Sequence, residues 1–110
     1  MRMDVKCLGQ LMAAEGGTPE GTVLEAIFDA VTVELHKLNA VDPFVGGSMA
    51  TGAVEVGVTV EASEAADCLA AADGLIRCAL HAAGVSTPTW DAADGREVTV
   101  ELEEYSLVSA

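Results

Sequence analysis

The chain has 110 residues, of which 51% are hydrophobic and only 4% aromatic, and its formal net charge is −13. This length suits one domain, residues 1–110, whose single core needs neither disulfides nor metals. Eighteen acidic residues against five basic ones leave no cluster of Lys and Arg to neutralise phosphates. We therefore expect no direct binding to nucleic acid or to an anionic membrane.

The first two predicted elements are a strand and a helix. Residues 4–12 predict a strand with apolar side chains on one side and Gly9 as a candidate bulge. After a loop, Thr18-Pro19-Glu20 is typical of a helix start, because a hydroxyl N-cap, a first-turn proline and an acid near the positive end of the helix dipole all favour it. Apolar residues then recur at three- and four-residue steps and predict one buried stripe: Leu24, Ile27, Phe28, Val31, Leu35 and Leu38.

A hairpin follows the first helix. Residues 44–50 predict the second strand, and residues 53–62, where apolar and polar side chains alternate strictly, predict the third. Thr51-Gly52 suits a two-residue turn between them. Such a turn pairs Gly47 with Val56 and places the apolar side chains of both strands on one face.

A second helix and a last strand complete the predicted order. Ser63 is typical of an N-cap and Gly84 of a helix end. Residues 85–94 predict a loop, and residues 97–105 predict the last strand.

The order strand, helix, strand, strand, helix, strand matches an α+β class with the ferredoxin-like (βαββαβ) plan. In this plan a four-stranded antiparallel sheet carries both helices on one face. Right-handed crossovers give the spatial strand order 4-1-3-2.

The other face of such a sheet is expected to be acidic and open. It would carry the following residues: Glu55, Glu61, Glu101, Glu103 and Tyr105. RNA-binding members of this fold class present stacking aromatic and basic residues there, so RNA recognition by this route is not expected. Face-to-face pairing of two copies would need Lys6 and Tyr105 at the centre of the contact and the acids at its rim.

The outer face of the second helix is a second candidate contact surface. Ala71, Gly74 and Cys78 are small where a solvated helix normally shows Lys, Glu or Gln, and His81 follows them in the last turn. Close approach of another backbone would explain these small residues, and so would an alanine-rich composition alone. Trp90, in the following loop, is either a lid on the core or an exposed anchor of this surface.

The same region offers no recognisable metal or catalytic site. Cys78 and His81 would supply half of a metal site, but no other ligands follow with suitable spacing, so we expect no metal and no cofactor. Three cysteines without a CxxC pair suit a reduced, cytoplasmic setting. The chain start lacks an apolar signal core, and no run reaches membrane-spanning length.

Several segments of the second half carry a resemblance. They are Thr51-Gly52-Ala53-Val54-Glu55-Val56, Val58-Thr59-Val60-Glu61-Ala62, Ile76-Arg77, Ala79-Leu80-His81-Ala82-Ala83-Gly84 and Thr87-Pro88-Thr89-Trp90. In these segments the chain resembles small acidic uncharacterised ferredoxin-like proteins of high-GC Gram-positive bacteria. The resemblance implies a cytoplasmic location, the βαββαβ plan, and a recurring association of His81 with Trp90. It implies no activity.

These observations favour a non-enzymatic protein-binding or regulatory module that forms a homodimer or binds a basic protein. An acidic nucleic-acid mimic that inhibits a DNA- or RNA-handling protein is the alternative, because the charge of −13 suits a basic binding site. A small enzyme with a site near the end of the second helix is the second alternative.

Overall fold

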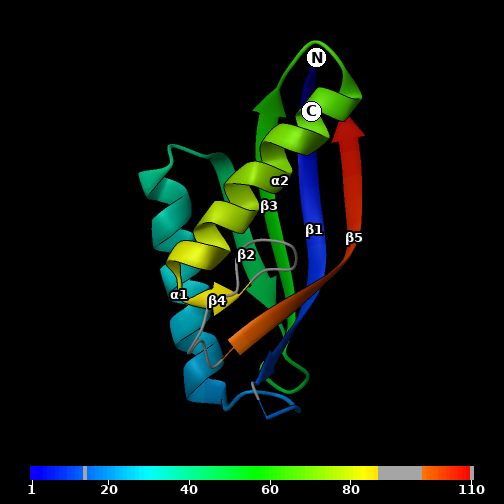
Figure 1. Cartoon of the computed structure of the whole chain (residues 1–110). Helices are drawn as coiled ribbons and strands as arrows, with labels where there is room; N and C mark the ends of the chain where they lie inside the picture. Colours follow the sequence, from blue (N-terminus) through cyan, green and yellow to red (C-terminus); the bar gives the residue numbers. More distant parts are fainter. Residues whose placement is uncertain (14, 87–97, 110) are drawn as a thin grey trace.

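Five strands form one curled sheet, and two helices lie against one of its faces (Figure 1). The structure is a computed structural model that describes residues 1–13, 15–86 and 98–109. In chain order the elements are β1 (Arg2–Ala13), α1 (Gly21–Lys37), β2 (Val41–Gly47), β3 (Ala53–Glu61), α2 (Ala65–Ala82), β4 (Val85–Ser86) and β5 (Val98–Ser109).

The predicted α+β class is confirmed, but the sheet is not the four-stranded antiparallel sheet of the ferredoxin-like plan. The strand order is β2-β3-β1-β5-β4, in which the four long strands are antiparallel and lie in the predicted order. The additional strand, β4, lies in residues that were predicted as a loop, and it pairs parallel with the start of β5. Gly84, at φ +93°, turns the chain directly after α2, so that Val85 is fully buried beside β5. The sheet is therefore mixed.

The connection between β2 and β3 is longer than predicted. Gly47 pairs with Val54 and not with Val56, which shifts the register by two residues. Inside the loop, the backbone N–H of Ser48 donates a hydrogen bond to the carbonyl oxygen of Ala53 at 2.9 Å. The carbonyl oxygen of Ser48 accepts one from the backbone N–H of Gly52 at 2.8 Å. A shift of two keeps the paired side chains of β2 and β3 on their predicted faces. Met49, which the predicted second strand included, lies in the loop and is 44% exposed.

Helix α1 begins later than predicted. Its N-cap is Glu20, which makes no side-chain capping bond. The predicted cap, Thr18, instead donates a hydrogen bond from Oγ1 to the carbonyl oxygen of Thr51 at 3.4 Å. The buried stripe of this helix is confirmed over most of its length, whereas Leu38, directly after the helix, is 40% exposed.

The core lies between the helices and the covered face of the sheet. It is built from alternate residues of the long strands and from one stripe of each helix, as the two periodicities predict. Its largest fully buried side chains are Val5, Cys7, Leu11, Leu24, Val31, Leu35, Val56, Cys68, Ile76, Leu80 and Val85.

Strand β5 bends midway, where it carries a bulge (Figure 1). Leu8 of β1 pairs with Glu104, whereas the next residue, Gly9, pairs with Leu102, so Glu103 has no partner on β1. A Cβ at Gly9 would lie 3.0 Å from a carbonyl oxygen of β5, so the close approach at the bulge suits glycine.

The bulge reverses the faces of the second half of β5. Val98 and Val100 face the helices before it, and Tyr105 and Leu107 pack against the core after it. The prediction that Tyr105 belongs to the open face is therefore wrong. One extra residue in the strand changes which side chains point inward.

Candidate binding surface on the open face of the sheet

The face of the sheet opposite the helices is uncovered by any described element, and it exposes large hydrophobic side chains. Four of these lie on it: Leu8 at 38%, Val41 and Phe44 at 47%, and Val108 at 59% exposure. We call these four residues the open-face patch. Scattered exposed hydrophobics are ordinary, whereas several on one sheet face make that face a candidate contact surface.

Lys6 lies at the centre of this face. In the register, Lys6 of β1 sits opposite Gly57 of β3, which in turn sits opposite Phe44 of β2. Its Nζ lies 5.3 Å from the centroid of the Phe44 ring and 3.4 Å from Oε1 of Glu55. The face thus contains one cation that contacts both an aromatic ring and a carboxylate.

The predicted acids lie around this centre. Glu55 is half-buried beside Lys6, whereas Glu61 is exposed at the end of β3. Glu101 pairs across from Gln10, and Glu103 occupies the bulge. The structure adds further acids that the sequence analysis did not single out: Asp4, Asp42 and Glu104.

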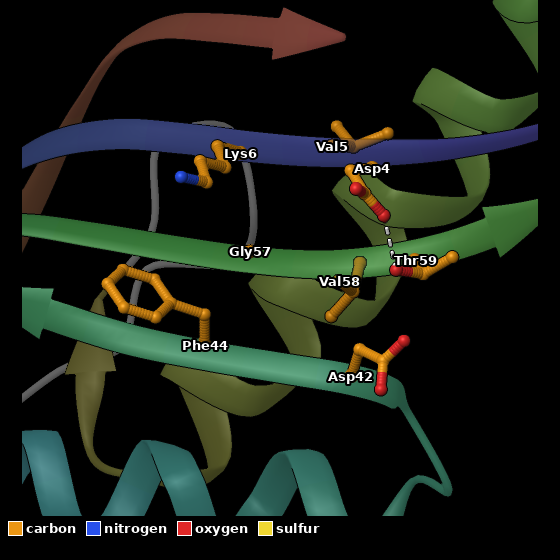
Figure 2. A pocket seen from close by; sticks show the side chains of 8 residues that line it. All are labelled: Asp4, Val5, Lys6, Asp42, Phe44, Gly57, Val58 and Thr59. Carbon is orange, nitrogen blue, oxygen red and sulfur yellow. Dashed lines mark hydrogen bonds between the residues drawn. The ribbon is translucent and has the colours of Figure 1, made fainter. Parts of the chain in front are cut away.

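A hollow of about 210 Å³ opens in this face, and Figure 2 shows it from close by. Its lining consists of Asp4, Val5, Lys6, Asp42, Phe44, Gly57, Val58 and Thr59. Phe44 and Lys6 lie at one end, and the two aspartates lie at the other with Thr59 (Figure 2). Gly57, between the two ends, has no side chain to fill the space.

The two aspartates are held in different ways. Thr59 is 7% exposed, and its Oγ1 donates a hydrogen bond to Oδ1 of Asp4 at 2.5 Å. Asp42 has a left-handed backbone with φ +46° and lies at an irregularity of β2 between Val41 and Phe44. Its Oδ2 lies 4.0 Å from Nη2 of Arg2, and both side chains are more than half exposed. This contact is therefore weak.

A second hollow, of about 280 Å³, lies farther along the sheet. It is lined by Leu8, Gly9, Gln10, Gly47, Ser48, Ala53, Val54, Glu55 and Glu103. The first hollow includes Lys6 and the second includes Glu55, so this ion pair lies between the two.

A polar cluster lies on the covered face, where sequence reasoning placed none. The Tyr105 hydroxyl donates a hydrogen bond to Oδ1 of Asp73 on α2, and Nε of Arg77 donates to the same oxygen at 2.9 Å. Burial and the bond to Asp73 raise the pKa of Tyr105, and burial raises the pKa of Cys7 beside it. The hydrogen bond from Tyr105 to Asp73 thus links β5 to α2. The sequence signals were the i, i+4 spacing of Asp73 and Arg77 and the break in alternation before Tyr105.

The structure places the second predicted surface on the outer side of α2. Ala71 and Cys78 are exposed, and Gly74 and His81 are partly exposed. A Cβ at Gly74 would meet nothing within 4 Å, so this position is open. Trp90 lies outside the described residues, and its association with His81 stays a prediction.

The remaining chemical groups form no recognisable centre. His36 lies on the exposed side of α1, with Nδ1 2.8 Å from the carbonyl oxygen of Thr32. Over residues 1–13, 15–86 and 98–109, no group of three or more His, Cys, Asp and Glu side chains is placed to hold a metal ion. Within the same ranges no helix is long and apolar enough to cross a membrane. No protein family, curated protein or solved structure matches this chain.

Proposed function

We propose that this protein is a non-enzymatic protein-binding module that docks its partner on the open face of the sheet. The observation that carries the proposal is the open-face patch around Lys6. Leu8, Val41, Phe44 and Val108 present apolar surface from three of the four long strands, β1, β2 and β5. Aromatic residues, phenylalanine included, are enriched at protein interfaces relative to the rest of the surface.

The charge of this face favours a basic partner. Among the described residues, this face has a net charge of −5, with the cations Arg2 and Lys6 against seven acids: Asp4, Asp42, Glu55, Glu61, Glu101, Glu103 and Glu104. A partner with apolar side chains inside a basic rim would complement this pattern and would be attracted over a distance. Two copies would bring equal negative charges together. Self-association through this face stays a prediction, and the experiment below tests it.

One edge of the sheet discourages strand addition. Edge strand β2 contains Pro43 and an irregularity in its pairing, and both features are usual ways in which proteins discourage pairing at an edge. At the other edge, β4 pairs only with Val98 and Thr99, so the rest of β5 borders no further described strand on that side. The exposed large apolar side chains lie on the face, and the partner is therefore expected there.

The distribution of acids supports this function over nucleic-acid mimicry. A mimic needs carboxylates arranged like phosphates along one side. Here acids are also exposed on or beside the helices, including Glu25, Asp29, Glu64 and Asp67. Charges on both sides of the domain suit a solvated acidic protein with a localised contact.

The test compares matched pairs of substitutions in affinity capture from extracts of the cells that make the protein. The variant Leu8→Glu with Phe44→Glu places two acids in the open-face patch. The control, Val23→Glu with Val33→Glu, places the same two acids on α1, where both valines are exposed. Sedimentation velocity on each purified protein gives the oligomeric state.

We expect the wild type and the α1 control to capture the same partner, and the open-face variant to lose it. Part of the binding should survive about 0.5 M NaCl, because salt screens the charges but leaves the apolar contact. Equal capture by both variants would contradict the proposal. Dimers that dissociate only in the open-face variant would identify a second copy as the partner.

A further inference from the structure

We infer that the hollow between Phe44 and the two aspartates receives a basic side chain of the partner, arginine in preference to lysine. This inference rests on the proposed function and names the chemistry that the open face recognises. Its basis is the juxtaposition of an exposed aromatic ring with two carboxylates across a space of about 210 Å³ (Figure 2).

The Phe44 ring already has a cation within cation–π distance. Nζ of Lys6 lies 5.3 Å from its centroid, within the distance at which a cation interacts with an aromatic ring. Oε1 of Glu55 lies 3.4 Å from the same ammonium nitrogen and balances its charge. Lys6 and Glu55 thus form a neutral pair at one end of the hollow.

The other end of the hollow keeps excess negative charge. Thr59 occupies Oδ1 of Asp4, and the second carboxylate oxygen can accept a further bond. Among the described residues, Asp42 has one ion-pair contact, with Arg2 at 4.0 Å, and both side chains of this contact are more than half exposed. A cation of the partner that enters this end of the hollow therefore meets two carboxylates, and for Asp42 it competes with the weak contact of Arg2.

The backbone keeps this space open. Gly57 lies under the hollow, and a Cβ there would lie 3.2 Å from Cγ of Lys6 and 3.6 Å from Cβ of Phe44. The irregularity in β2 places Asp42 along the hollow, and its left-handed backbone is one that aspartate adopts more readily than most residues.

Arginine fits these groups better than lysine does. Asp4 lies on β1 and Asp42 on β2, with β3 between them. A guanidinium carries five N–H donors in a plane, so it can bond to one carboxylate while its face stacks on a ring. An ammonium is a compact charge that attracts its ligands without this planar match.

The experiment titrates three peptides into the full chain and follows its backbone amide resonances by NMR. The probes are acetyl-Leu-Arg-Leu-amide, the same peptide with lysine, and the same peptide with glutamine. The site variant is Asp4→Asn with Asp42→Asn, which keeps side-chain shape and tolerates the left-handed backbone. The matched control is Glu25→Gln with Asp29→Asn on α1, which removes the same amount of charge.

We expect the arginine peptide to shift the amides of residues 44, 57 and 59 and to bind more tightly than the lysine peptide. The site variant should weaken this binding by at least about tenfold, since a hydrogen bond to a charged group is worth roughly 1.5–3 kcal/mol. The α1 control should bind as the wild type does. Phe44→Leu, which keeps apolar bulk but removes the ring, should weaken the arginine peptide more than the glutamine peptide.

Three results would overturn the inference. Equal affinity of the arginine and glutamine peptides would show that the hollow recognises no cation, and shifts on this face would then leave the proposed function standing. Equal weakening by the site variant and the α1 control would show that only net charge matters. Peptides that shift no resonance of the open face would contradict the inference, and intact capture by the Leu8→Glu, Phe44→Glu protein would separately contradict the proposed function.

Discussion

The two faces of this sheet are made from the same strands and differ in what their side chains do. On β1, Val5, Cys7 and Leu11 face the helices and are at most 2% exposed. Between them, Lys6 and Leu8 face outward, and Leu8 is 38% exposed. Because side chains alternate along the strand, one set stabilises the fold and the other set is available for contact with a partner.

Each face also contains side chains of a type that is more usual on the opposite face. The covered face includes the polar cluster of Tyr105, Asp73 and Arg77, and the open face includes the apolar side chains of the open-face patch. These polar groups are partly buried and bond to one another, and the bond from Tyr105 to Asp73 links β5 to α2. On the open face, Phe44 contacts Lys6 but is still 47% exposed, and Val41 and Val108 are 47% and 59% exposed. This exposure is the basis of the proposed contact with a partner.

The largest expected difference in the free energy of unfolding is between variants of the leucines on the two faces of β1. Leu11→Ala should lower the free energy of unfolding by about 2–5 kcal/mol, because it removes a fully buried side chain and leaves a cavity. Leu8→Ala should lower it by only about 0.5 kcal/mol, because this side chain is partly in water already. Urea unfolding of both variants measures the difference. Equal losses would show that the open face is covered in solution.

Hydroxyl groups on the two faces give the next comparison. Tyr105→Phe removes a donor to Asp73 and should cost about 1.5 kcal/mol, the value expected for a bond to a charged group. Thr59→Val removes a donor to Asp4, whose exposed carboxylate can bond to water instead, and should cost less. The same urea experiment ranks the two. A larger loss for Thr59→Val would contradict a structural role for the polar cluster.

Alkaline pH should weaken the covered face. The pKa values of Cys7 and Tyr105 are raised above their ordinary values of 9.0 and 10.0 by burial, with a hydrogen bond to Asp73 acting on Tyr105 as well. Above pH 9.0 the unfolded chain releases protons that the folded protein keeps. The free energy of unfolding should therefore be unaffected by these groups below this pH and should fall as the pH rises. Urea midpoints across this range should fall less steeply in Cys7→Ala with Tyr105→Phe than in the wild type.

The sequence predicted the covered face better than the open one. Apolar alternation in residues 53–62 and the stripe of α1 identify core residues because burial depends on simple periodicity. The face of Tyr105 was wrong because a single unpaired residue, Glu103, reverses the alternation after it. That signal is visible in the sequence, since the inward apolar positions run 98, 100 and 102 and then resume at 105 and 107.

The candidate site depends on features that local patterns do not contain. Phe44 and Lys6 are far apart in the chain, and they meet only because Gly57 lies between them in the sheet register. The left-handed backbone of Asp42 and the two-residue shift of the hairpin arise from specific hydrogen bonds and an irregularity in β2. Periodicity alone predicts neither.

The smallest expected effect tests the second candidate contact surface, on α2. Glycine within a helix costs roughly 0.5–1 kcal/mol relative to alanine, and a Cβ at Gly74 would meet nothing within 4 Å. Gly74→Ala should therefore raise the free energy of unfolding by about this amount. The bulkier Gly74→Lys should leave the oligomeric state measured by light scattering unchanged, because the open face is the proposed contact. Loss of an assembly in Gly74→Lys, with Leu8→Glu and Phe44→Glu having no such effect, would move the contact surface from the sheet to α2.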